Sequence, residues 1–199
     1  MSRFAANFPD EKHLWRAFKS GDSEAYAQLY DAYFEALYRY GKKISSDTFL
    51  VEDCIQDLFI SLWRNRETLS DLLSPKFYLY KSLRNNIVAQ LKSQQPESFE
   101  LHANAVSLAG STPSPESFII GEETAKNQEE TIEAALQELT KREREAIFLK
   151  FYGGLNSEEI SRIMGIGIPS VYNLINRAIT QLGHSMDKLL FLFWLLANF

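Results

Sequence analysis

The sequence predicts an all-α protein: two small helical domains joined by a flexible linker, the second containing a helix-turn-helix. Apolar residues recur at helical spacing through most of the chain, and no convincing strand with a period of two residues is present. Residues 93–121 interrupt this pattern with three prolines and several serines, which are typical of a linker. We therefore expect domains at residues 9–92 and 122–186, and an apolar tail at residues 187–199.

Three helices are expected in the first domain. Asp22 and Asp47 can each cap a helix, the first ending near residue 43 and the second near residue 65. A third helix is expected over residues 76–92. The aromatic residues of the first helix recur at helical spacing, so we expect them in the core.

In the second domain, helical character resumes near Glu122. Thr140 and Glu143 have the spacing of a capping box, in which each side chain accepts a hydrogen bond from the backbone of the other residue. A helix is therefore expected to begin at this point. Gly153 and Gly154 are expected to end it.

Residues 155–182 have the pattern of a helix-turn-helix. Ser157 can cap a short helix, Gly165 can end it, and Pro169 fits the first turn of a second helix. The second helix has an apolar stripe on one side and polar residues on the other, as in helices that enter the DNA major groove. The candidates for DNA contact are Ser170, Tyr172, Asn173, Asn176 and Arg177.

The alternative for this segment is a plain helical hairpin with a solvated polar face. Arg177 is the only charged residue between Pro169 and Leu182 in the sequence. Phosphate contacts usually dominate DNA affinity, so this helix by itself should bind DNA weakly.

Composition restricts the function further. The formal net charge of the 199 residues is −5, so DNA binding requires locally concentrated basic residues or a basic partner. Cys54 is the only cysteine, the three histidines are scattered, and no phosphate-binding glycine loop or pair of catalytic carboxylates is recognisable. We expect no enzymatic activity, no catalytic residues, no cofactor or metal and no small-molecule substrate. The N-terminal sequence does not have the pattern of a signal peptide, which predicts a cytoplasmic protein.

Residues 75–95 contain no acidic residue, and three of their basic residues, Lys81, Arg84 and Lys92, share a helical face. Aromatic residues stand at the start of this helix. Such a composition suits single-stranded nucleic acid, because aromatic rings stack on bases while cations follow the backbone. The alternative is a solvated basic face with inward-pointing aromatics. The candidate contact residues are Tyr78, Tyr80, Lys81, Arg84, Asn85 and Lys92.

The preceding helix carries acidic residues beside apolar ones. A polar rim around aromatic anchors is typical of protein-docking surfaces. An ordinary amphipathic helix with buried Phe59 and Trp63 fits the pattern equally well. The candidate docking residues are Asp53, Gln56, Asp57, Phe59, Leu62 and Trp63.

Taken in order, these segments resemble bacterial sigma factors of the sigma-70 family, in the small two-domain extracytoplasmic-function group. Residues 21–38 resemble the start of the family's region 2, residues 52–63 its core-polymerase-binding motif, and residues 78–85 its promoter-melting helix. Residues 139–145 and the helix-turn-helix resemble its region 4.

The resemblance implies a transcription initiation factor that binds core RNA polymerase and directs it to promoters. The first domain would dock on polymerase and capture the melted −10 element, and the second would bind the duplex −35 element. An anti-sigma partner is typical of the group, although the sequence itself does not indicate one. The alternative function is a conventional helix-turn-helix regulator that acts without core polymerase.

Two features depart from the family pattern. Tyr172 and Leu174 occupy positions where members often carry Lys or Arg, which favours polar or shape readout of the −35 element. The chain also ends on an apolar run at residues 189–197, which is too short to cross a bilayer as a helix. We expect this tail to complete the core of the second domain or to cover a surface that polymerase or an anti-sigma protein would occupy.

Overall fold

The computed structural model describes residues 11–69, 74–94, 136 and 138–185. All regular secondary structure in these ranges is helical, which confirms the predicted fold class. Most of the predicted linker and the whole apolar tail lie outside the described residues. The described elements are α1 (Glu11–Lys19), α2 (Ser23–Ile44), α3 (Thr48–Arg64), α4 (Pro75–Gln94), α7 (Lys141–Ile147), the π-helical turn η1 (Phe148–Tyr152), α8 (Ser157–Met164) and α9 (Ile168–Ser185).

The caps of α2 and α3 are those that the sequence predicts. The Asp22 carboxylate accepts hydrogen bonds from the backbone N–H groups of Glu24, at 2.8 Å, and Ala25, at 3.2 Å. The Asp47 carboxylate accepts one from the N–H of Leu50 at 3.1 Å. Each carboxylate satisfies N–H groups that have no partner within the helix.

The capping box at the start of α7 is also confirmed, but the helix that follows is shorter than expected. The Thr140 hydroxyl accepts from the Glu143 N–H at 3.3 Å, and the Glu143 carboxylate accepts from the Thr140 N–H at 2.9 Å. The chain then widens into η1, where the Gly153 N–H donates to the Phe148 carbonyl at 2.8 Å. A Cβ at Gly153 would lie 2.6 Å from the Leu149 carbonyl oxygen, so the end of this turn requires glycine.

The helix-turn-helix is formed by α8 and α9, with one correction to its predicted start. Asn156, rather than Ser157, caps α8: its side chain accepts from the Glu159 N–H at 2.9 Å, and the Glu159 carboxylate accepts from the Asn156 N–H at 2.9 Å. Because Asn156 forms this reciprocal box, Ser157 becomes the first helical residue. Gly165 ends α8 in the left-handed conformation with φ +66°, and Pro169 lies in the first turn of α9, as predicted.

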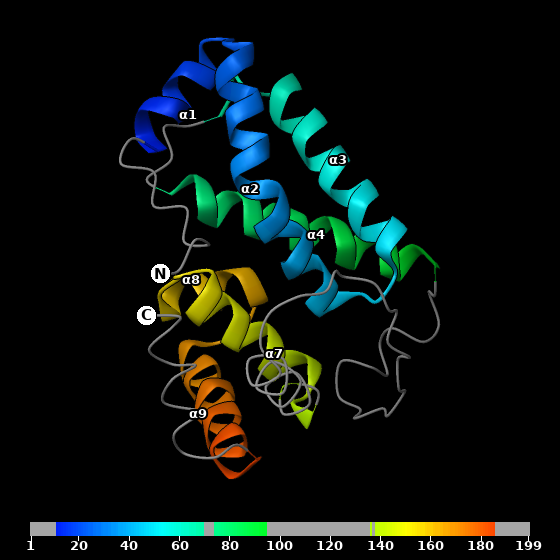
Figure 1. Cartoon of the computed structure of the whole chain (residues 1–199), viewed down its shortest axis with the longest axis vertical. Coiled ribbons are helices and arrows are strands. Elements are labelled where there is room, and N and C mark those ends of the chain that lie inside the picture. Colours follow the sequence, from blue (N-terminus) through cyan, green and yellow to red (C-terminus); the bar gives the residue numbers. More distant parts are fainter. Residues whose placement is uncertain (1–10, 70–73, 95–135, 137, 186–199) are drawn as a thin grey trace, which may run out of the picture.

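The described helices form two groups that pack against each other (Figure 1). In the first group, α2 packs against α1, α3 and α4. In the second group, α9 packs against α7 and α8. The groups meet where α8 lies against α4 and α7 lies against α2.

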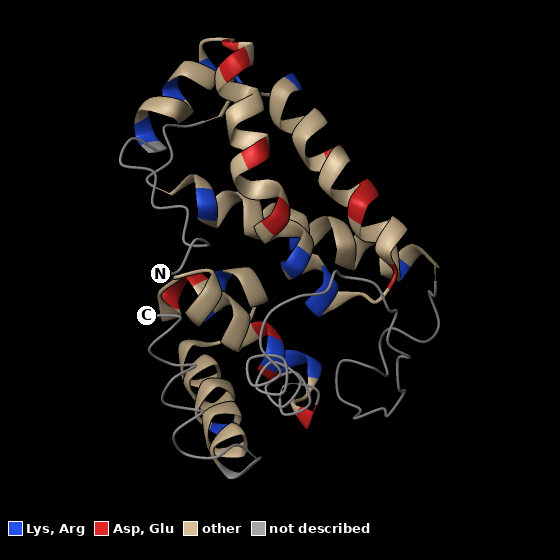
Figure 2. Cartoon of the chain, in the orientation of Figure 1, with Lys and Arg blue, Asp and Glu red and all other residues tan. Residues whose placement is uncertain are grey.

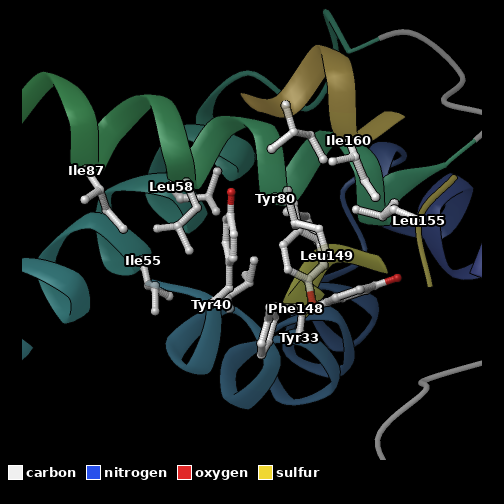
Figure 3. Packing of buried hydrophobic residues seen from close by; sticks show 14 of the residues in the cluster. Tyr33, Tyr40, Ile55, Leu58, Tyr80, Ile87, Phe148, Leu149, Leu155 and Ile160 are labelled. Carbon is white, nitrogen blue, oxygen red and sulfur yellow. The ribbon is translucent and has the colours of Figure 1, made fainter. Parts of the chain in front are cut away.

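A continuous apolar core crosses this junction (Figure 3). The ring of Tyr40 in α2 lies 5.0 Å from that of Tyr80 in α4 and 5.9 Å from that of Phe148 in η1, measured between centroids. Leu155 and Ile160, at the start of the helix-turn-helix, are buried in the same cluster. The sequence predicts two helical units, whereas this close packing between them is a finding of the structure.

Candidate nucleic-acid and protein interfaces

The outer face of α9 carries the predicted major-groove residues. The apolar stripe of this helix, Val171, Ile175, Ala178 and Leu182, is buried against the rest of the second group. All five candidates on the opposite face are exposed, and Tyr172 is 54% exposed. The structure therefore brings Ser170, Tyr172, Asn173, Asn176 and Arg177 together on one accessible surface.

This surface is amide-rich and apolar rather than basic. Figure 2 shows a single basic position on α9, which is Arg177. Ile168, which sequence reasoning missed, is 41% exposed and stands four residues before Tyr172, so both lie on the same side of the helix. Helical spacing in the sequence would have identified this pair.

The predicted single-strand surface on α4 is only partly accessible. Lys81, Asn85 and Lys92 are exposed, and Lys81 Nζ lies 5.7 Å from the centroid of the Phe77 ring. Tyr78 is half-buried, and its ring lies edge-on to that of Trp15, with centroids 6.2 Å apart. These residues share the solvent-facing side of the helix.

Tyr80 does not belong to this surface. It is 1% exposed, and burial raises the pKa of its phenol. The expectation that Tyr80 could stack on a base is wrong for this conformation, because the ring is packed between the two groups of helices.

Arg84 points away from solvent and into the junction. Its Nε donates to a Glu145 carboxylate oxygen at 2.7 Å, and only 19% of the Arg84 side chain is exposed. The Tyr40 hydroxyl donates to the same oxygen at 2.9 Å. Glu145 belongs to α7, so one carboxylate of the second group joins two helices of the first.

The predicted protein-docking helix, α3, divides into a core face and a polar face. Asp53, Gln56 and Asp57 are exposed, as a docking surface requires. Phe59 and Leu62 are each 1% exposed, so the expectation that Phe59 is an accessible anchor is wrong. The Phe59 ring instead lies 4.9 Å from that of Tyr30, between α2 and α3.

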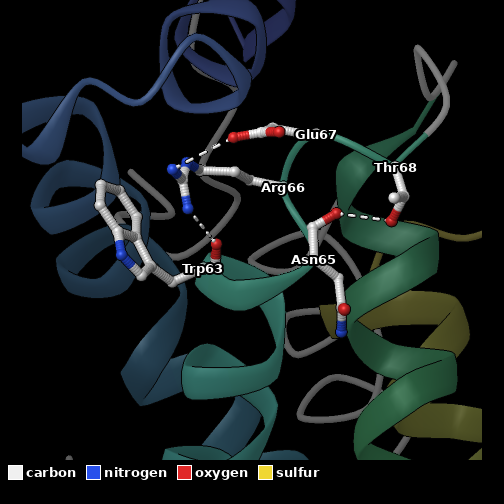
Figure 4. Close-up of polar contacts among 5 residues, drawn as sticks. All are labelled: Trp63, Asn65, Arg66, Glu67 and Thr68. Carbon is white, nitrogen blue, oxygen red and sulfur yellow. Dashed lines mark hydrogen bonds and ion pairs between the residues drawn. The ribbon is translucent and has the colours of Figure 1, made fainter.

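Trp63 is half-buried, and Figure 4 shows the Arg66 side chain beside its indole. The ring lies 5.0 Å from that of Tyr26 and 6.3 Å from that of Phe18. The Arg66 guanidinium lies 4.7 Å from the indole centroid and donates to the Trp63 carbonyl at 2.9 Å, while its other end pairs with Glu67 at 3.4 Å. The indole therefore closes one end of the α2–α3 core.

The exposed apolar residues of α3 are ones that sequence reasoning missed. Phe49 is 80% exposed and Ile60 is 53% exposed. Together with Asp53 and Gln56 they recur at intervals of four, three and four residues, which places them on one helical stripe. A helical projection of the sequence contains this signal. We call Phe49, Asp53, Gln56 and Ile60 the α3 stripe.

Other kinds of site find no support in the part of the chain that the structure describes. It contains no group of three or more His, Cys, Asp or Glu side chains arranged to hold a metal ion. None of the described helices has the length and apolarity needed to cross a membrane.

Comparison with known proteins gives the family context of these surfaces. The description "Sigma-70 region 2" matches residues 29–97, and "Sigma-70, region 4" matches residues 129–182. ECF RNA polymerase sigma factor SigL of Mycobacterium tuberculosis is 25% identical over 162 residues, which are 81% of this chain and 88% of SigL.

Two solved structures are similar in fold. CnrH, solved in complex with the cytosolic domain of CnrY, is 18% identical, with a TM-score of 0.56 over 87% of this chain and 95% of that one. RpoE of Bartonella quintana, solved with the anti-sigma factor NepR, is 21% identical, with a TM-score of 0.56 over 80% of this chain and 94% of that one.

Proposed function

Because the chain belongs to the extracytoplasmic-function group of the sigma-70 family, whose members direct RNA polymerase to promoters, we propose which of its surfaces meet polymerase and which meet DNA. The α3 stripe with Asp57 binds core polymerase, the exposed side of α4 binds the melted −10 strand, and the outer face of α9 binds the −35 duplex. The observation that carries this proposal is that the exposed side chains differ in kind among the three helices: acidic on α3, basic on α4 and amide-rich on α9. Figure 2 shows the charged positions on these helices.

The polymerase-binding surface is the α3 stripe rather than the aromatic pair expected from the sequence. Phe49 and Ile60 are exposed apolar side chains at the two ends of the stripe, and Asp53 and Gln56 lie between them. Apolar anchors surrounded by polar groups supply most of the affinity in protein interfaces. Phe59, Leu62 and Trp63 support this surface from the core side of the helix.

The −10 surface of α4 combines cations with a half-exposed ring. Lys81, Asn85 and Lys92 are accessible, with Tyr78 beside them at the start of the helix. Lysines attract the phosphates of a strand, and the amide of Asn85 can bond a base edge. Arg84 can join this surface only when its ion pair with Glu145 is broken.

The −35 surface of α9 reads bases through amides and apolar groups. Asn173 and Asn176 can each bond an adenine edge through two hydrogen bonds, and Arg177 can bond a phosphate. Ile168 and Tyr172 are placed to contact thymine methyl groups, because apolar side chains recognise these groups in the major groove. A −35 element rich in A·T pairs fits such a surface best.

Binding to DNA with and without core polymerase tests the function itself. A sigma factor should protect a promoter from nuclease only together with core polymerase, whereas a conventional helix-turn-helix regulator binds its operator without polymerase. Protection of specific sites by the isolated protein, unchanged on addition of core polymerase, would contradict the proposal.

We further propose that the protein works in the cytoplasm, has no catalytic activity of its own and is held by an anti-sigma partner. RpoE of Bartonella quintana, to which the chain is similar in fold, was solved bound to the anti-sigma factor NepR. Affinity purification of the tagged chain from its native host, followed by mass spectrometry, would test this partner. Recovery of core polymerase subunits alone, under both resting and stress conditions, would contradict it.

A further inference from the structure

The junction between the two groups of helices contains a buried, charged contact. Glu145 of α7 is 5% exposed, and a single oxygen of its carboxylate accepts from both Arg84 Nε and the Tyr40 hydroxyl. The donors lie 61 and 105 positions away in sequence. Burial by itself would lower the pKa of Arg84, but contact with the Glu145 carboxylate outweighs burial and raises it, so the guanidinium stays charged.

Apolar packing surrounds this contact on both sides. Tyr40 packs against both Tyr80 and Phe148, and α8 places Ile160 in the same buried cluster (Figure 3). Breaking one partner of a buried ion pair leaves an uncompensated charge, whereas separating the two groups of helices returns both charges to water. Loss of Glu145 charge should therefore drive the groups apart rather than leave them packed.

The packed arrangement is incompatible with simultaneous contact to both promoter elements. Elements centred near −10 and −35 lie about 25 base pairs apart, or about 85 Å along B-DNA at 3.4 Å per pair. Because α9 packs on α8, and α8 packs on α4, the two DNA-binding helices lie within about two interhelical spacings, or about 20 Å. Residues 95–135 would reach about 135–150 Å if fully extended, so the covalent chain permits separation.

We propose that the free protein is held in a closed state by Glu145, which occupies Arg84 in place of a DNA phosphate, and that the two groups of helices separate before promoter binding. A carboxylate and a phosphate oxygen present similar charged acceptors to a guanidinium, so a DNA strand competes with Glu145 for the same group. The contacts at the junction support the closed state independently of the proposed function. Its consequence for the −10 strand rests on the function proposed for α4.

Energy transfer between two dyes measures closure in the full-length free protein. Cysteines introduced by Ser61→Cys in α3 and Thr180→Cys in α9 occupy exposed positions on opposite groups. Cys54 is fully buried, and burial raises the pKa of its thiol to about 11, so it does not compete for the dyes at neutral pH.

The variants change the charge of the contact and then restore it. Glu145→Arg sets two cations against each other and should lower transfer efficiency, and the near-isosteric Glu145→Gln should do so more weakly. The exchange Arg84→Glu with Glu145→Arg should recover the original efficiency. Glu158→Gln is the matched control, because Glu158 pairs with Arg162 on the exposed side of α8 at 2.6 Å and does not touch the junction. Unchanged transfer in folded Glu145→Arg and Glu145→Gln would overturn the closed state.

Binding of a fluorescent single strand with a −10 sequence, without polymerase, tests the masking. If the closed state is about 90% populated, opening should tighten binding about tenfold, since the apparent affinity scales with the competent fraction. Glu145→Arg should show this gain and Glu158→Gln should not. Opening without any gain would overturn the masking and the −10 role of α4 together, while leaving the closed state in place. A failure of promoter selection with core polymerase would instead count against the proposed function.

Discussion

Substitution of Gly41 by alanine should destabilise the first group of helices, although alanine is the better helix former. Gly41 is buried in α2 where this helix meets α3 and α4. A Cβ built at this position would lie 2.5 Å from Val51 Cγ1 and 3.3 Å from Ile87 Cδ1. The first distance is far below an ordinary contact between carbon atoms, so either the helices or the Val51 side chain must move.

The expected magnitude is the difference between two opposing terms. Replacing glycine by alanine inside a helix is favourable by about 0.5–1 kcal/mol, because the unfolded chain loses freedom. Forcing a methyl group into a packed core costs about 1–3 kcal/mol. At the midpoints of these ranges, we expect Gly41→Ala to lower the free energy of unfolding by about 1 kcal/mol, and by no more than about 2.5 kcal/mol. A loss of about 1 kcal/mol corresponds to a fall in Tm of about 2–4 °C for a chain of this size.

Urea unfolding followed by far-UV circular dichroism measures this change, and α9 offers the matched control. A Cβ at Gly183 would have no neighbour within 4 Å, so Gly183→Ala should raise the free energy of unfolding by about 0.5–1 kcal/mol. The double variant Gly41→Ala, Val51→Ala should be more stable than the sum of the single effects, because Val51→Ala removes the clashing methyl. Equal stabilisation by alanine at both glycines would refute the reasoning.

Four further predictions concern single positions. Ile60→Ala should weaken binding to core polymerase about tenfold or more and leave stability unchanged, whereas Phe59→Ala should lower the free energy of unfolding by about 3–5 kcal/mol. Surface plasmon resonance measures the binding and urea unfolding measures the stability, and the reverse pattern would restore Phe59 as the anchor. Asn173→Ala should reduce discrimination at one or two −35 positions by about 1–3 kcal/mol in transcription from a randomised promoter library, leaving −10 preference intact. Asn156→Ala should cost about 1 kcal/mol in thermal unfolding by removing the α8 cap, and no change would mean that Ser157 replaces it. Burial raises the pKa of Cys54 from 9.0 to about 11, so the stability that the protonated thiol contributes is complete below pH 9 and is lost as the pH rises from 9 to 11. Between pH 8 and pH 10, urea unfolding should show a larger fall in the free energy of unfolding for the parent protein than for Cys54→Ala, and an equal fall in both would contradict this linkage.

The polymerase-binding helix illustrates how far sequence pattern alone reaches. The sequence predicts α3 as an amphipathic helix and identifies its acidic face correctly, since Asp53, Gln56 and Asp57 are exposed. The sequence does not decide whether Phe59 is exposed or buried, because the residues from other helices that pack against it cannot be read from the pattern of α3. That choice depends on Tyr30 of α2, which packs against Phe59 in the folded chain.

The sequence by itself determined α2, α3, α4, α8 and α9, most of their caps and the two faces of α9, because these depend on interactions between residues no more than four positions apart. The Asp22 and Asp47 caps and the Thr140–Glu143 box are of this kind. The sequence did not predict α1. Only the tertiary structure decided that Tyr80 is buried and that Arg84 is paired with Glu145, 61 residues away. Local periodicity places Arg84 beside a basic face, but a buried carboxylate from another part of the chain redirects it, since a charge removed from water requires a partner.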